Sequence, residues 1–121
     1  NATAPSDSAN WEAYSDERLK ELLAEGKPVF LNFTASWCIS CLVNERVALS
    51  TETVKKQFEQ QGIVYLKGDW TNRDPQITGF LKKFNRSGVP LYVFYPEGKA
   101  ETPVELPQIL TPDIVIAAIN Q

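Results

Sequence analysis

The sequence contains no histidine, no methionine and only two cysteines among its 121 residues. Without histidine there can be no Ser/His or Cys/His dyad and no imidazole that titrates near neutral pH. The longest apolar stretches are a few residues, far short of the roughly 20 that a membrane-spanning helix needs. The formal net charge is −3 and the basic residues are scattered, which argues against binding to nucleic acid or to an anionic membrane surface.

What the sequence does have is the composition of one ordinary globular domain, with 43% hydrophobic and 22% charged residues. A chain of this length can bury about two thirds of its unfolded surface, which is enough for a core without metals or disulfides. Residues 1–10 are small and polar and show no periodicity, so we expect a disordered leader or linker there. We expect the folded domain to occupy residues 11–121.

Short apolar runs alternate with amphipathic segments along the chain, and this alternation predicts an α/β fold. A break is expected at Ser50, between two helical segments. The expected strands are 29–34, 63–67, 89–95 and 103–106, the last an edge strand because it contains prolines, and the expected helices are 15–26, 38–49, 51–62, 74–84 and 111–119. This order predicts a mixed central sheet flanked by helices, with an N-terminal helical extension.

Both cysteines lie in the segment Trp37-Cys38-Ile39-Ser40-Cys41, which follows a strand and begins a helix. The free N–H groups and partial positive charge of a helix start stabilise a thiolate, and CxxC cysteines there have pKa values of about 3.5 to 7.5 instead of about 8.5. We therefore predict that Cys38 is the nucleophile, at an exposed helix tip. Cys41, one turn further, faces the protein and can resolve a mixed disulfide formed at Cys38.

Other uses of a cysteine pair are less well supported. A structural disulfide over so short a loop contributes only on the order of 2 kcal/mol. Structural zinc needs two further Cys or His ligands, which the chain lacks, whereas Cu(I) needs only two thiolates and stays open as an alternative. We expect no resident metal, and no cofactor beyond a redox-active disulfide. CxxC alone does not fix the direction of exchange, so an oxidase or isomerase is a further alternative.

The motif Trp37-Cys38-x-x-Cys41, together with Gly88-Val89-Pro90 before a core strand, resembles the thioredoxin fold over residues 11–120. The resemblance implies that the peptide bond before Pro90 is cis and that Pro90 faces the disulfide. It also implies that the backbone of Val89 offers strand-like hydrogen bonds to a bound partner. The alternative for Pro90 is a trans proline that merely begins a strand.

Three segments, 33–45, 68–75 and 87–92, are similar to the C-terminal periplasmic domain of DsbD-type thiol:disulfide interchange proteins, including the ScsB branch linked to copper tolerance. The resemblance implies a monomeric periplasmic protein-disulfide reductase. Such a domain takes electrons from a cysteine pair in the transmembrane domain of the same parent protein. It passes them to another periplasmic thioredoxin-like domain or disulfide protein, in roles that include cytochrome c biogenesis.

Three positions near the cysteines are candidates for tuning and partner binding. The resemblance implies a buried Asp at the position of Asn32, but an amide carries no charge and cannot act as a base. Glu45 lies four residues after Cys41 on the same helix face and is our candidate for disfavouring a nearby thiolate and moving the Cys41 proton. The alternative interpretation of Glu45 is a solvated helix residue paired with Lys or Arg. The alternative interpretation of Asn32 is a hydrogen-bonded core amide with no role in exchange. Trp37 is expected to offer partners an apolar platform, or else to pack in the core.

Overall fold

The computed structural model describes residues 11–121, so the leader or linker expected at residues 1–10 lies outside the described residues. Its centre is a five-stranded sheet with the strand order β1-β3-β2-β4-β5. The strands are β1 Trp11–Ala13, β2 Val29–Thr34, β3 Val64–Asp69, β4 Leu91–Tyr95 and β5 Val104–Glu105. β1, β3 and β2 are parallel, whereas β4 and β5 run antiparallel to their neighbours, which makes the sheet mixed.

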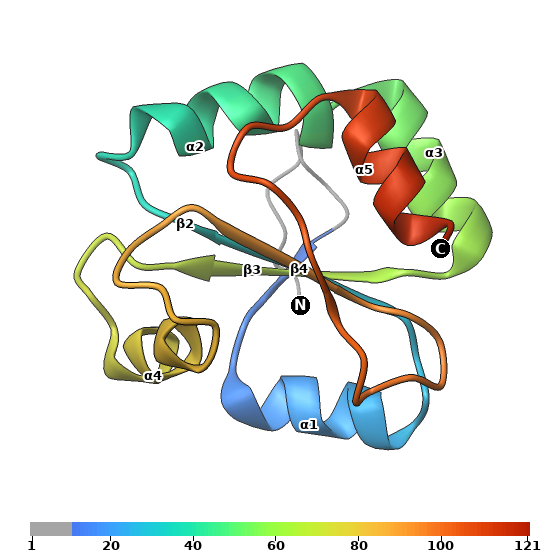
Figure 1. Ribbon diagram of the computed structural model, residues 1–121, viewed down its shortest axis with the longest axis horizontal. Coiled ribbons are helices and arrows are strands. Elements are labelled where there is room, and N and C mark those ends of the chain that lie inside the picture. Colours follow the sequence, from blue (N-terminus) through green and yellow to red (C-terminus); the bar gives the residue numbers. More distant parts are fainter. Residues whose placement is uncertain (1–10) are drawn as a thin grey trace.

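Helices cover both faces of this sheet (Figure 1). They are α1 Asp16–Ala24, α2 Ile39–Asn44, the π-helix η1 Glu45–Leu49, α3 Glu52–Gln61, α4 Pro75–Lys83 and α5 Pro112–Ile119. Side chains of Ser15, Thr51, Asp74 and Thr111 accept backbone N–H groups at the starts of α1, α3, α4 and α5. The starts of these four helices are therefore encoded by local residues.

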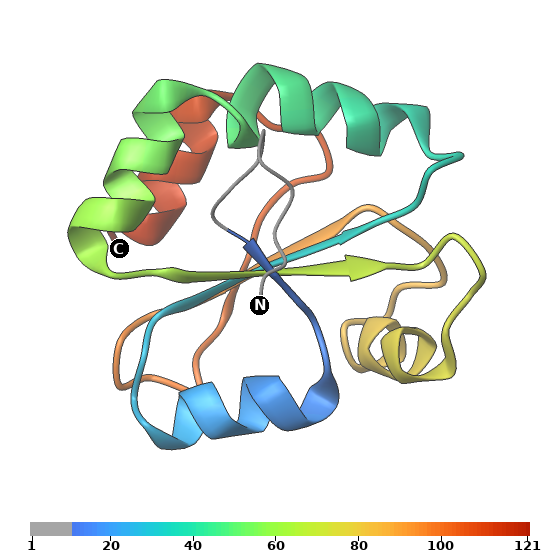
Figure 2. The same ribbon diagram turned by 180° about the vertical axis from the view of Figure 1, so that it is seen from behind.

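The sheet separates two layers of helices, as the views from both sides show (Figures 1 and 2), and a hydrophobic cluster lies under each layer. Alternate residues of β2 point to opposite faces, so Phe30 packs with residues of α3 and α5, and Leu31 and Phe33 pack with residues of α1 and α4. Asn32 lies on the same face as Phe30 and is paired in register with Lys67 of β3 and Tyr92 of β4. Polar groups therefore interrupt the apolar layer on the face that α2 covers.

The predicted mixed sheet flanked by helices is confirmed. Strand β1 was not predicted, because three residues are too few to show a period of two. The helix expected as an N-terminal extension is α1, which packs its buried Leu19 and Leu22 into the second layer. The helix break expected at Ser50 is present, but the π-helical turn before it was not foreseen. Within residues 11–121, no helix has both the length and the apolar character needed to cross a membrane.

Candidate active site

Cys38 and Cys41 are joined by a disulfide at the start of α2, directly after β2, with 5.3 Å between their Cα atoms. Cys38 is the N-cap residue of α2, and its Sγ accepts a hydrogen bond from the backbone N–H of Cys41 at 3.2 Å. An N–H directed at sulfur favours negative charge on that sulfur. The pair therefore has the local geometry predicted for a cysteine pair at a helix start.

The two cysteines differ in exposure. Cys38 keeps 7% of its surface exposed and Cys41 keeps none, so the predicted order is observed. The prediction of an exposed tip is nevertheless wrong in degree, because Cys38 packs with Ala35 and Cys41, and Val89 lies against this cluster. The Ser40 hydroxyl also lies 3.6 Å from Cys38 Sγ. Only a narrow edge of the disulfide, on the Cys38 side, is open to an attacking thiolate.

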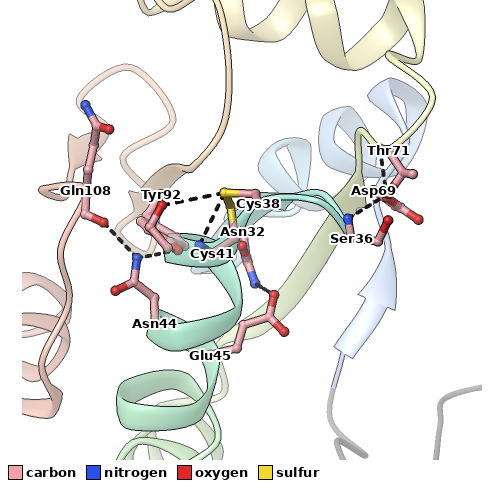
Figure 3. The surroundings of a disulfide bond; sticks show 11 residues. Asn32, Ser36, Cys38, Cys41, Asn44, Glu45, Asp69, Thr71, Tyr92 and Gln108 are labelled. Carbon is pink, nitrogen blue, oxygen red and sulfur yellow. Dashed lines mark hydrogen bonds between the residues drawn. A yellow bond between two sulfur atoms is a disulfide. The ribbon is translucent and has the colours of Figure 1, made fainter.

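A polar network lies beneath the disulfide (Figure 3). The amide nitrogen of Asn32, which is fully buried, donates to Tyr65 Oη at 3.0 Å and to Glu45 Oε2 at 3.4 Å. The other carboxylate oxygen of Glu45 lies 3.4 Å from Lys67 Nζ, and both side chains are largely buried. Glu45 is thus paired with a lysine, as one of its two interpretations expected. It also contacts the buried amide of Asn32 below the cysteines.

The charge of Glu45 contributes to raised pKa values of two buried tyrosines. Burial raises the pKa of Tyr65 well above its ordinary value, a hydrogen bond from Asn32 opposes that rise, and the Glu45 charge adds to it. Burial likewise raises the pKa of Tyr92 to about 12, with opposition from the Asn44 hydrogen bond and a further rise caused by Glu45. Both hydroxyls therefore stay neutral at physiological pH and serve as hydrogen-bonding groups.

Asn44 connects α2 to the opposite end of the chain. Its Nδ2 donates to Tyr92 Oη at 2.9 Å and to the Gln108 carbonyl at 2.7 Å, and its Oδ1 accepts from the Leu110 N–H at 3.0 Å. Figure 3 shows Asn44 between Tyr92 and Gln108. The helix that carries the cysteines is thereby fixed to β4 and to the segment before α5, and Ile109, which lies between the two bonded residues, is left 68% exposed.

Trp37 is 48% exposed, so it is not a core residue and its indole lies at the surface. Its Nε1 donates to the Thr71 carbonyl at 3.0 Å, while the Thr71 hydroxyl accepts from the Ser36 N–H. Its ring lies 6.0 Å from the buried ring of Trp70, and the Arg73 guanidinium lies 5.3 Å from the Trp37 ring. These contacts fix the indole beside Cys38.

The Val89–Pro90 peptide bond is cis, as the resemblance implied. Val89 is partly buried against the cluster that contains both cysteines, and β4 begins one residue after Pro90. The segment is thus next to the disulfide although about 50 residues of chain separate the two in sequence.

A groove of about 540 Å³ opens along the edge of the active-site helix. Its lining residues include Thr34, Leu42, Glu45 and Lys67. The carboxylate beneath the cysteines therefore has a route to solvent that does not pass the disulfide. Within residues 11–121, no group of three or more Cys, Asp or Glu side chains is arranged to hold a metal ion.

Several site residues were not found from the sequence. Tyr65, Lys67 and Asn44 stand in a strand or a helix without a motif around them, and their role depends on which strand lies next to which. The alternation of Tyr65 and Lys67 on one side of β3 places both on the face of Asn32, but only the sheet order reveals this. Of the predicted residues, Cys38, Cys41, Asn32, Glu45 and Val89 are brought together.

Comparison with known proteins agrees with this geometry. Residues 10–97 match a family model described as thioredoxin-like. DsbD 1 of Pseudomonas aeruginosa, a thiol:disulfide interchange protein, is 35% identical over 105 residues, which is 83% of this chain but only 17% of that protein. The chain thus spans about one sixth of the length of this relative.

Solved structures agree in fold. The C-terminal domain of Neisseria meningitidis DsbD in its reduced form superposes with a TM-score of 0.70 at 23% identity, covering 88% of this chain and 96% of that one. Chloroplastic thioredoxin z gives a TM-score of 0.71 at 22% identity and covers 93% of each chain. The predicted thioredoxin fold and the predicted similarity to the DsbD C-terminal domain are confirmed. On the family match, the cysteine pair and the sheet order together, the chain belongs to the thioredoxin-like family.

Proposed function

We propose that this domain is a protein-disulfide reductase that relays electrons by dithiol/disulfide exchange. The observation that carries the proposal is the asymmetric disulfide at the start of α2, where Cys38 is slightly exposed and Cys41 is fully buried. Such an arrangement lets a partner reach the sulfur of Cys38, while the buried sulfur of Cys41 can resolve the mixed disulfide.

In the reductive half of the cycle, the thiolate of an electron-donating dithiol attacks Cys38 Sγ. The S–S bond breaks, a mixed disulfide forms at Cys38, and Cys41 leaves with the electron pair and takes up a proton. The second donor thiol, as its thiolate, then attacks the donor sulfur in the mixed disulfide and releases Cys38. The donor ends as a disulfide, and two electrons have moved to this domain.

In the oxidative half, the Cys38 thiolate attacks a disulfide of the accepting protein, and one acceptor sulfur leaves and is protonated. Cys41 loses its proton and attacks Cys38 Sγ, which restores the internal disulfide and releases the acceptor as a dithiol. Glu45 is the proposed proton acceptor and donor for Cys41. Its contact with Asn32 beneath the pair and its access to solvent through the groove support this role.

Partners contact the apolar residues around the disulfide. The exposed large hydrophobic side chains include Trp37, Ile39, Leu42 and Ile109. Such side chains usually mark an interaction site when they occur as a group. The backbone of Val89 adds strand-like hydrogen bonds to a partner segment. The contact is small and transient, because a carrier must release each partner, and the domain acts as a monomer.

The electron donor is a cysteine pair in a transmembrane domain of the same parent protein, and the acceptor is a periplasmic thioredoxin-like domain or disulfide protein. The domain works in the periplasm, where its acceptors include proteins of cytochrome c biogenesis or, as in the ScsB branch, of copper tolerance. The similarity to part of a much longer interchange protein supports this placement.

Trapping tests the proposal. A Cys41→Ser variant cannot resolve its mixed disulfides, so partners remain attached at Cys38, whereas the matched Cys38→Ser variant should retain none. Exposure to a periplasmic extract is expected to yield thioredoxin-like proteins. Recovery of many unrelated unfolded proteins would instead indicate an oxidase or isomerase. Titration of the wild type against glutathione provides the second measurement, and a reductase requires a potential well below that of the glutathione couple.

A further inference from the structure

One oxygen beneath the disulfide has no partner. Asn32 is fully buried, yet its Oδ1 makes no hydrogen bond in this oxidised structure. An unsatisfied buried acceptor destabilises the folded protein, so proteins seldom keep one without a reason. A hydrogen-bond donor for this oxygen is therefore expected in another state of the protein.

The orientation of the Asn32 amide is fixed by its other end. Its Nδ2 lies between Tyr65 Oη and Glu45 Oε2. A carboxylate can only accept hydrogen bonds, so turning the amide over would set oxygen against oxygen and leave the nitrogen without an acceptor. Lys67 holds Glu45 in place from the other side. The oxygen of Asn32 must therefore point away from Glu45.

The direction away from Glu45 leads to the cysteines. Figure 3 shows the Asn32 amide between Glu45 and the disulfide. Asn32 lies on the sheet face that α2 covers, and Cys41 is the fully buried cysteine of α2. In the oxidised protein Cys41 Sγ carries no hydrogen to donate.

We propose that Asn32 Oδ1 is the hydrogen-bond acceptor for the Cys41 thiol in the reduced domain. When the S–S bond breaks, the two electrons come from the partner dithiol and Cys41 takes one proton, so that its new S–H group satisfies the orphan oxygen. The oxidised state carries an unpaired acceptor that the reduced state does not. Asn32 thereby favours the dithiol form without supplying a charge, which is a different role from that of an acid at this position.

This inference rests on redox cycling of the Cys38–Cys41 pair, but not on the direction of the relay or on the identity of any partner. If the pair failed to cycle, the proposed function would fail. If it cycled normally and Asn32 had no influence on the Cys41 thiol, only the present inference would fail.

The first test observes the S–H group directly. A Cys38→Ser variant retains Cys41 as its only thiol, because the chain has two cysteines, so its infrared S–H stretching band is unambiguous. We expect a band at lower frequency than that of the same variant unfolded in urea, and a shift back toward the unfolded value when Asn32→Leu is added. A band at the unfolded position in the folded Cys38→Ser variant would overturn the proposal, even if the double variant did not fold.

The second test measures the redox equilibrium. Asn32→Leu removes Oδ1 of Asn32. The oxidised state thereby loses an unpaired buried acceptor, and the reduced state loses the acceptor of the Cys41 thiol. Its equilibrium constant for reduction by glutathione should fall about tenfold, which corresponds to a potential about 30 mV more negative. Tyr65→Phe is the matched control, because it removes a partner from the nitrogen side of the same amide. It should lower the stability of both redox states and leave the equilibrium unchanged. Equal shifts in both variants, or none in Asn32→Leu, would contradict the proposal.

Discussion

Replacing Asn44 with alanine should destabilise the domain more than most single substitutions. The change removes three hydrogen bonds, of 2.7, 2.9 and 3.0 Å, and leaves the Gln108 carbonyl and the Leu110 N–H without their partner. A buried or partly buried backbone group that loses its partner costs about 1–3 kcal/mol, so the free energy of unfolding should fall by about 3–5 kcal/mol. That is a large part of the 5–15 kcal/mol or so typical of a domain.

Urea unfolding followed by tryptophan fluorescence measures this loss. With a slope of about 2 kcal/mol per molar urea, the midpoint should fall by about 2 M. Hydrogen exchange offers a local readout, because the amide of Leu110 donates to Asn44 and should lose its protection before that of Leu106, which donates to the Tyr92 carbonyl.

Asn72→Ala is the matched control for the Asn44 prediction, since Asn72 is exposed in a turn. Its effect should stay within about 0.5 kcal/mol. A loss below 1 kcal/mol for Asn44→Ala, or unchanged protection of Leu110, would refute the view that Asn44 fixes α2 to β4 and to the segment before α5.

Three further predictions concern packing, ionisation and partner contact. Gly68→Ala should cost about 1–3 kcal/mol in thermal or urea unfolding, because a Cβ would lie 2.6 Å from Phe33 Cδ1, whereas Gly79→Ala in helix α4 meets nothing within 4 Å and should stabilise by up to about 1 kcal/mol; a loss at Gly79 as large as at Gly68 would contradict this. Burial raises the pKa of Tyr92 from 10.0 to about 12, so the unfolded chain releases its proton first and stability falls as pH rises from 10 to about 12. Tyr92→Phe should make the alkaline fall in unfolding free energy shallower, and an unchanged slope would count against the assignment. Trp37→Ala should raise the KM for a protein partner without changing the redox potential, and a changed potential with constant KM would argue against a contact role.

Much of the fold could be predicted because its signals are local. Capping residues such as Ser15 and Thr51 mark helix starts, and continuous apolar runs such as β2 mark buried strands. The cysteine pair was found for the same reason, since its spacing and its place after a strand lie within one short segment. Strand β1 escaped prediction because three residues show no period, and pairing with β3 is what holds it in place.

The site was predicted less completely than the fold. Asn32 and Glu45 were singled out, but not the ion pair with Lys67 or the hydrogen bond to Tyr65, because these depend on the register between β2 and β3. The π-helical turn that begins at Glu45 has no sequence signature either. The exposure of Cys38 was overestimated, because the chain that covers the disulfide comes from a distant segment.

The sequence by itself determined the chemistry available to this protein: two cysteines at the start of a helix, no histidine, and an amide in place of an acid. Those features are set by residue type and by spacing along a few residues. Only the tertiary structure decided that Asn32 meets Glu45, 13 residues away, and that Asn44 meets Leu110, 66 residues away. Such contacts depend on strand order and register, which arise from burial of the whole sheet between its helices and are not written in any local pattern.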